Sequence, residues 1–449
     1  MSYATDNVSS ISAYAQINNQ PQHVPLETFD VQLAAYGSIG HFSATTAISA
    51  LAEYGWGPNN LLGSAIDNAQ PSLSDGSPSY PIKLYATGAY DGVTRLIFAG
   101  DIDELSWDFD NDELRITGRD YGGRMRDWMA VLTPSWMNMS YAGFAAAIIT
   151  GVGLTPQIAT SKTVNDPIGS LLFAIGENNI PGYSRLGYNT AGVSDEVSAF
   201  SNPRNMWDLL NEVARSVGFI VTVHLDGSVY VGPPGGDSTL DLTPRTFTWF
   251  AAENTPNIVP VRRLNIDHGP RQYGTFAVRA FGFHPPSVQV IATQVMAFSG
   301  SQASFQSAAL GRQQLSAGVY KSSVINQSAE TGKPNYFFYL PGVKQDRLEQ
   351  IAVGMAFDIA RRLYIVHGEI DGDPTLVPTT PMTLSEAVPG YLQGYAGKTL
   401  HIASVNHTFG MSRDESGESE GFLTRFKAWY TPPAPQVPGV TNQTDKVTS

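Results

Sequence analysis

Apolar and polar residues alternate along the first quarter of the chain, with the period of two that is typical of half-buried β-strands. The pair Asp91-Gly92 separates two of these segments and is a strong signal for a tight hairpin. The pattern predicts roughly six strands, enough for a small β-barrel. The clearest segments are Leu26–Tyr36, His41–Ala47, Ile82–Ala86, Val93–Ala99 and Leu114–Thr117.

The spacing of apolar residues becomes helical in the middle of the chain. Asn202 followed by Pro203 is typical of a helix start, and Gly218 stands where that helix should stop. Ser140 is a candidate N-cap for another helix, and Asp226-Gly227 predicts a second hairpin. These elements predict a compact α+β unit. The apolar stripe of the first helix consists of Met206, Leu209, Leu210, Val213, Ala214 and Val217.

Strand patterns return after Thr246. Asp346–Val366 has an apolar face at helical spacing and predicts a helix that covers a barrel, whereas Ser299–Ala329 predicts an irregular loop or arm. The predicted fold class is mainly β with α+β: two small β-barrel domains plus an inserted α+β domain. The two β sets show no visible sequence repeat. Strands are expected at Val261–Ile266, Thr275–Phe283, Val288–Phe298, Tyr336–Leu340, Thr399–Phe409 and Phe422–Tyr430.

These changes in pattern predict five parts of the chain. They are a flexible N-terminal arm (1–25), a first β-barrel domain (26–130), an α+β domain (131–245), a second β-barrel domain (246–430) with a covering helix and an irregular insertion, and a Pro-rich disordered tail (431–449).

The stretch Leu96–Ala130 connects the first predicted barrel to the α+β unit. Its sequence predicts a strand, an acidic turn, a second strand and a short helix. Gly118 is expected to give the backbone extra conformational freedom at the end of the second strand. Asp120 occupies the expected N-cap position of the helix. The stretch is therefore expected to close the barrel, and it has no arrangement suited to catalysis.

Composition excludes several classes of function. The net charge of −13 argues against nucleic-acid binding by phosphate neutralisation, because such binding requires clustered basic residues. An acidic surface can instead repel DNA. The absence of cysteine excludes disulfides and thiolate chemistry and fits folding in a reducing cytoplasm. The first twenty residues lack the features of a signal peptide, and no apolar run predicts membrane anchoring.

The candidate catalytic and metal-binding patterns are weak. Asp108, Asp110 and Asp112 have a calcium-loop spacing, but Glu113 and Arg119 occupy the positions that require Gly and Glu, so a solvated hairpin tip is expected. His401 and His407 share a strand parity but are too far apart for one metal. Gly417–Gly421 matches G-x-S-x-G within a polar turn, which is the wrong setting for a nucleophile elbow. No catalytic, cofactor-binding or metal-binding residue is assigned, and no cofactor is expected.

The order of several short motifs resembles the tailed-phage late control D and baseplate hub family, which is related to the N-terminal part of type VI secretion spike proteins. One motif is the run F-A-G-D-I followed by L-R-I-T-G-R-D-Y, and another is the Trp207 helix that ends at Gly218. The helix Asp346–Val366 followed by two strands resembles the second barrel of that family. The structural motif residues are Gly100, Gly118, Arg119, Asp120, Tyr121, Trp207 and Gly218.

The resemblance implies a structural protein and no enzyme. It implies a homotrimer whose tail-tube-like barrels form a ring that adapts a six-fold tail tube to a three-fold spike. The expected partners are the spike protein, the tail tube or distal tube protein and other baseplate proteins, and DNA would pass through the lumen without specific binding. The expected location is the baseplate of a phage virion, assembled in the host bacterial cytoplasm, or a related contractile injection system.

Two other functions stay open at this point. One is a tail-associated cell-wall hydrolase: carboxylates such as Asp101 and Asp103 share one strand parity, and a glycosidase-type pair could lie among the many acidic residues. The other is the distal hub of a non-contractile tail.

Overall fold

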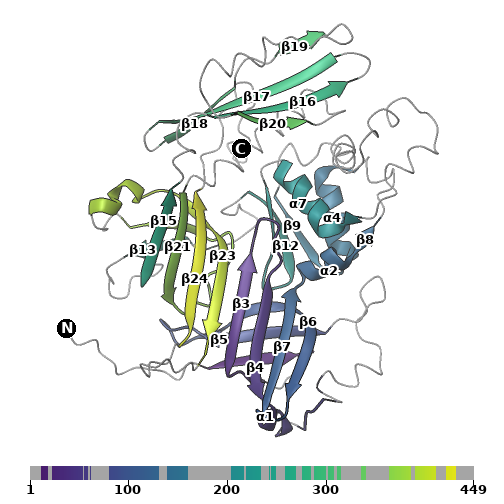
Figure 1. Ribbon diagram of the computed structural model, residues 1–449, viewed down its shortest axis with the longest axis vertical. Coiled ribbons are helices and arrows are strands. Elements are labelled where there is room, and N and C mark those ends of the chain that lie inside the picture. Colours follow the sequence, from purple (N-terminus) through teal and green to yellow (C-terminus); the bar gives the residue numbers. More distant parts are fainter. Residues whose placement is uncertain are drawn as a thin grey trace, which may run out of the picture.

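The computed structural model shows a mainly β protein with a few short helices. Its largest unit is a fourteen-stranded hydrogen-bonded sheet that contains strands from both predicted β sets (Figure 1). The structure describes residues 12–18, 23–53, 55–58, 61, 80–130, 139–159, 204–216, 219–233, 242, 244–248, 258–268, 276–284, 288–299, 302–307, 311–314, 335–339, 364–385, 390–410 and 421–430.

The first β set has the strand order β3-β4-β7-β6-β5-β1-β2, with every neighbouring pair antiparallel. Buried and exposed residues alternate along β3, β4 and β7, as the sequence predicted. The short helix α1 (Ile48–Ala52) follows β4. The strands are β1 (Ala13–Ile17), β2 (Val24–Pro25), β3 (Thr28–Ala34), β4 (His41–Ala47), β5 (Pro81–Thr87), β6 (Thr94–Asp108) and β7 (Glu113–Asp120).

The segment expected to be a flexible arm contains two of these strands. β1 pairs with β5 from Ala13 to Ile17, and its side chains at alternate positions are buried. Val24 in β2 is also buried. The alternation in Ala13–Ile17 is short and depends on two alanines, so it gives little signal in the sequence. The first β set therefore includes residues upstream of 26.

The second β set has the order β15-β21-β24-β23-β22-β13-β14. Residues 346–363 of the predicted covering helix lie outside the described residues, but Tyr364–Val366 belong to β21. That end of the prediction is wrong, because Ile365 and Val366 pair with strands on both sides. A 3-10 helix, η6 (Gly390–Tyr395), precedes β23. The strands are β13 (Arg245–Thr248), β14 (Ile258–Pro260), β15 (Arg263–His268), β21 (Tyr364–Asp371), β22 (Pro381–Leu384), β23 (Leu400–Phe409) and β24 (Leu423–Tyr430).

The two β sets repeat one another in topology. Both begin with four antiparallel strands, β3-β4-β7-β6 in one and β15-β21-β24-β23 in the other, and both continue through a fifth antiparallel strand, β5 or β22. The ladder shifts register between Ile102 and Glu104 in β6 and between Ile402 and Ser404 in β23. Each of these long strands therefore has a bulge at the equivalent place.

Strands β3 and β23 join the two sets. They pair antiparallel from Ser404↔Ala34 to Phe409↔Phe29, so one sheet continues from the second set into the first. Figure 1 shows β24, β23, β3, β4 and β7 side by side across the middle of the molecule. The buried side chains of both sets form one apolar cluster on one face of this sheet.

The α+β unit contains the predicted helices. Helix α4 (Tyr141–Gly151) begins at Ser140, whose hydroxyl accepts a hydrogen bond from the amide of Gly143 at 3.1 Å. Helix α7 (Met206–Ser216) buries its predicted stripe from Met206 to Ala214, while Val217 and Gly218 lie outside the described residues. The strands form a sheet of β9 (Thr155–Ile158), β12 (Ser228–Gly232) and β11 (Ile220–Val223), and a pair of β8 (Met129–Ala130) and β10 (Arg204–Asn205).

Both Asp-Gly hairpins are confirmed. Gly92 between β5 and β6 has a φ of 65°, and Gly227 between β11 and β12 has a φ of 84°, a conformation that glycine adopts at little cost.

A separate five-stranded sheet has the order β18-β17-β16-β20, with β19 also paired to β17. The predicted strands at Thr275–Phe283, Val288–Phe298 and Tyr336–Leu340 correspond to three of its members. The expected irregular segment Ser299–Ala329 instead contains two strands, β18 and β19. The strands are β16 (Phe276–His284), β17 (Val288–Ser299), β18 (Gln302–Ser307), β19 (Gly311–Gln314) and β20 (Asn335–Tyr339).

Candidate functional site

Most of the motif residues meet where the chain leaves β7 and enters helix α2 (Gly122–Asp127); we call this region the β7–α2 joint. Gly100 in β6 lies opposite Asp120 in β7, and Gly118 lies opposite Ile102. Trp207 reaches the same place from helix α7. Gly218 lies outside the described residues.

Gly100 and Gly118 are required for space between strands. A Cβ atom on Gly100 would lie 2.1 Å from the carbonyl oxygen of Arg119, and one on Gly118 would lie 2.1 Å from that of Asp101. Gly118 is inside β7 and has no positive φ, so the expectation that it frees the backbone at the strand end is wrong. Its role is to allow β6, β7 and the ring of Phe42 to approach closely.

Asp120 is a buried carboxylate that connects two turns. It accepts hydrogen bonds from the amide of Gly40 at 2.5 Å and from the amide of Gly122 at 2.7 Å. Burial raises the pKa of Asp120 to about 7, although both amides and the nearby Arg119 favour the charged form. The residue at the N-cap position is Tyr121, so Asp120 acts one position earlier than predicted while still accepting the first helical N–H.

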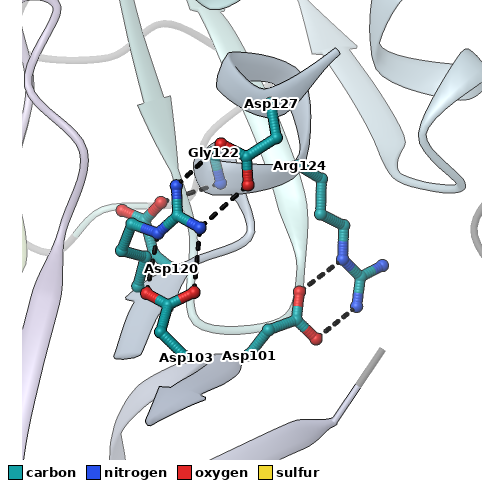
Figure 2. Close-up of polar contacts among 7 residues, drawn as sticks. Asp101, Asp103, Asp120, Gly122, Arg124 and Asp127 are labelled. Carbon is teal, nitrogen blue, oxygen red and sulfur yellow. Dashed lines mark hydrogen bonds and ion pairs between the residues drawn. The ribbon is translucent and has the colours of Figure 1, made fainter. Parts of the chain in front are cut away.

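Two arginines hold helix α2 against β6 (Figure 2). The guanidinium of Arg119 makes two hydrogen bonds with Asp103, at 2.7 and 2.8 Å, and two with Asp127, at 3.0 and 2.8 Å. Arg124 makes a similar fork with Asp101, at 2.6 and 2.9 Å. Such paired hydrogen bonds between a guanidinium and a carboxylate fix the relative orientation of the two groups as well as pairing their charges. Asp101 and Asp103, the carboxylates of the hydrolase alternative, are therefore both in ion pairs with arginines.

Trp207 attaches the α+β unit to the first β set. Its side chain is 1% exposed, and its indole N–H donates to the carbonyl oxygen of Gly37, in the β3–β4 turn, at 3.0 Å. The ring also lies against Gly122, where an added Cβ would be 3.2 Å from the indole. Helix α7, the β3–β4 turn and helix α2 therefore meet around one side chain.

A second feature is the polar face, defined here as the side of the eight-stranded run β15-β21-β24-β23-β3-β4-β7-β6 that points away from the apolar cluster. It has two shallow depressions of about 600 and 660 Å³. Gln32 and Asn406 line both, so the depressions adjoin across the β3–β23 pair. Asn406 donates to Asp30 at 2.8 Å across this pair.

The polar face carries both signs of charge. Arg425 pairs with Glu369 at 2.9 Å, and His367 lies 3.3 Å from Asp267. Basic and acidic side chains are interspersed on this face. The charged residues include Arg115, Arg119, Arg263, Arg425 and Lys427 together with Asp30, Asp101, Glu104, Asp108, Glu113, Asp267 and Glu369.

The acidic triplet stabilises its own hairpin. One oxygen of Asp108 accepts from the amides of Asp110 and Asn111, both at 3.1 Å. Asp112, at a φ of 57°, accepts from the amide of Ser49 at 2.8 Å. Asp108 therefore forms the hairpin turn, whereas Asp112 holds the start of helix α1 against it.

The two histidines of β23 are buried on opposite sides of the strand. His401 pairs with Trp429 and hydrogen-bonds to Tyr36, whereas His407 pairs with Thr424 and contacts its hydroxyl at 3.0 Å. The bulge at Ala403 changes the parity between them, so the prediction of one shared face is wrong. Burial lowers the pKa of His407 to about 4, which keeps its ring neutral near pH 7.

Within the part of the chain that the structure describes, no group of three His, Cys, Asp or Glu residues is placed to hold a metal ion. In the same part, none of the helices combines the length and apolar character needed to cross a bilayer. Residues 411–420, which include most of the G-x-S-x-G match, lie outside the described residues.

Comparison with known proteins identifies the fold. No protein-family model and no curated protein matches the sequence. The structure is similar to a tail protein from Neisseria meningitidis MC58, with a TM-score of 0.52 and 11% identity over 95% of this chain and 99% of that chain. It is also similar to a 43 kDa tail protein of prophage MuSo2 from Shewanella oneidensis, with a TM-score of 0.50 and 10% identity over 93% and 98% of the two chains. The chain therefore has the fold of phage tail proteins, as the sequence resemblance indicated.

Gly118→Val is expected to destabilise the protein by about 2–3 kcal/mol or more, because the added atoms would lie between the backbone of β6 and Phe42. Urea unfolding followed by tryptophan fluorescence measures the effect. Gly57→Val is the matched control, since a Cβ at Gly57 meets nothing within 4 Å. Equal stability of the two variants would contradict the close approach assigned to Gly118.

Asp120→Asn is expected to cost more stability at pH 5 than at pH 7.5. The raised pKa means that the folded protein keeps a proton on Asp120 between about pH 4 and 7, where the unfolded chain has lost it. Wild-type stability from this group therefore falls as pH rises through that window, and the variant lacks this dependence. The measurement is the difference in unfolding free energy between the two proteins at each pH; a deficit that grows with pH would show that the two amides outweigh burial.

Proposed function

We propose that this chain is a structural protein of a phage tail, the central baseplate hub, and that it acts as a homotrimer. The ring would adapt a six-fold tail tube to a three-fold spike and would form part of the DNA channel. The observation that carries the proposal is the topological repeat: one chain holds two related β sets, joined side by side in a single sheet. Three such chains would supply six similar units around an axis.

The fold supports this assignment. The two tail proteins named above are matched over 98% or more of their length, so the likeness extends over their whole architecture. The first unit of the proposed hub corresponds to the barrel assigned to 26–130, extended by β1 and β2, and the second to the barrel assigned to 246–430. The α+β domain assigned to 131–245 would sit between them in sequence and brace the first unit through Trp207.

The polar face is the candidate wall of the channel. It is continuous across the β3–β23 pair, and its two depressions give it a concave surface. Its bases are interspersed with acids, so it offers no uniform positive surface to a phosphate backbone. Such a wall would let DNA pass without specific binding.

The proposed partners follow from this position in the tail. They are the spike protein on one side of the ring, a tail tube or distal tube protein on the other, and neighbouring baseplate proteins. The proposed location is the virion, after assembly in the bacterial cytoplasm.

Light scattering after size-exclusion chromatography tests the oligomeric state. The expected mass is three times that of the chain, and mixing with the cognate spike protein should give a larger complex that elutes earlier. A protein that stays monomeric at all concentrations, with and without the spike, would overturn the proposal.

A further inference from the structure

One difference between the two β sets concerns the outer neighbour of the first strand, β3 or β15. β3 pairs with β4 on one side and with β23 on the other. Its counterpart β15 pairs with β21 on one side, and in the part of the chain that the structure describes no strand lies on its other side. β15 therefore has an edge without a described partner strand, at the position where its counterpart β3 pairs with β23.

The complementary edge is the second half of β6. In β23, Leu400 and His401 pair with β22, and the residues after the bulge pair with β3. In β6, the residues up to Asp101 pair with β5, but Glu104–Asp108 have a described partner strand only in β7. Exposed strand edges of this kind are templates for pairing with another chain.

Both edges carry apolar side chains on the same face of the sheet. Leu105 and Trp107 of β6, and Leu264 and Ile266 of β15, are only partly buried against the apolar cluster. Phe109, just beyond β6, is 66% exposed, and its ring stacks on Trp107 with the centroids 6.1 Å apart. Large apolar groups along an open edge mark an interaction surface.

We propose that the second half of β6 pairs antiparallel with β15 of a second copy of this chain. The run β15-β21-β24-β23-β3-β4-β7-β6 contains eight strands, and every neighbouring pair in it is antiparallel. Its two edge strands therefore run in opposite directions, so a copy added head to tail continues the antiparallel order. Such a contact is heterologous and closes into a ring. This inference rests on the proposed function, which sets the number of copies at three.

The internal repeat fixes the register of the contact. The row Ile102–Gly118–Phe42–Val31 in the first set corresponds to Ile402–Ala428–Val366–Ile266 in the second. Val31 lies opposite His407 in the β3–β23 pair. By equivalence Ile266 of one copy lies opposite Trp107 of the next.

The same register brings other compatible residues together. Leu264 falls beside Phe109, which corresponds to the stacked pair Phe29 and Phe409 inside the chain. On the polar face, Asp267 falls opposite Ser106. Arg263, whose side chain is 84% exposed, falls next to the acidic hairpin tip that contains Asp110. The contact therefore joins apolar groups on one face and opposite charges at one end.

Cysteine cross-linking tests this register, since the natural chain has no cysteine. Ser106→Cys combined with Asp267→Cys should give a covalent trimer on a non-reducing gel after mild oxidation, because opposed Cα atoms in antiparallel strands are about 4.5–5.5 Å apart. The matched control, Ser106→Cys with Arg263→Cys, is displaced by four residues, or about 13 Å, and should not cross-link. Each single-cysteine variant should stay uncross-linked.

The outcomes separate this inference from the proposed function. A trimer by light scattering that fails to cross-link, or that cross-links in the displaced pair, would overturn the strand pairing and leave the trimer intact. Cross-linking of Ser106→Cys alone would show that like edges pair, which also overturns it. A protein that neither cross-links nor forms a trimer would overturn both.

Phe109→Asp provides a second test that does not depend on disulfide geometry. A carboxylate at this position should raise the concentration at which the trimer dissociates at least tenfold, because it would be buried against Leu264. Val93→Asp is the control, because Val93 is 46% exposed in the β5–β6 turn, away from both edges. Circular dichroism checks that both variants fold. Equal dissociation of the two variants would contradict the contact.

Discussion

The pairing of β3 with β23 is the constraint on which the architecture depends. It brings Asp30 and Asn406, which are 376 residues apart in sequence, within hydrogen-bonding distance. Without it, both strands would leave a row of backbone donors and acceptors facing no partner at the middle of the molecule. The aromatic rings of Phe29, Phe409 and Phe422 meet across it, so the pairing also closes the apolar cluster. The two β sets therefore form one sheet with a shared core.

At the β7–α2 joint the chain leaves the sheet while the β6–β7 pair stays intact. Glycines at 100 and 118 let β6 and β7 approach each other, and Asp120 then satisfies two amides where the ladder ends. Burying a carboxylate is costly, and the raised pKa of Asp120 is the measure of that cost. The two arginine forks flank the joint and orient helix α2. The fork of Arg119 with Asp103 is about one-third exposed, whereas that of Arg124 with Asp101 is mostly buried.

Local features were predictable from the sequence, whereas features set by strand register were not. The Asp-Gly hairpins, the cap at Ser140 and the stripe of α7 each depend on a few neighbouring residues, and each is present. The repeat of the two β sets leaves no trace in the sequence. Equivalent positions such as Phe42 and Val366 share only apolar character, and Gly118 and Ala428 share only small size. A bulge changes the side-chain parity without leaving a sequence signal, which explains the error at His401 and His407. Gly118, Asp120 and Trp207 stand out in the sequence, but the contacts of Asp120 with Gly40 and of Trp207 with Gly37 depend on tertiary packing.

In the proposed trimeric ring, the junction within a chain and the junction between chains would differ in energy. Inside the chain, β3 and β23 are held near each other by the folded units between them, so pairing costs no translational freedom. Between chains, association costs several kcal/mol for that freedom, and the interface must supply the difference. Trp107 stands at the position equivalent to His407. The outer edge thus has a large aromatic residue where the internal junction has a buried neutral histidine. Tryptophan contributes more buried area than any other side chain, so it suits a contact that has to supply binding energy. On the proposed pairing, the difference between Trp107 and His407 would follow from the fact that only the β6 edge has to bind another molecule.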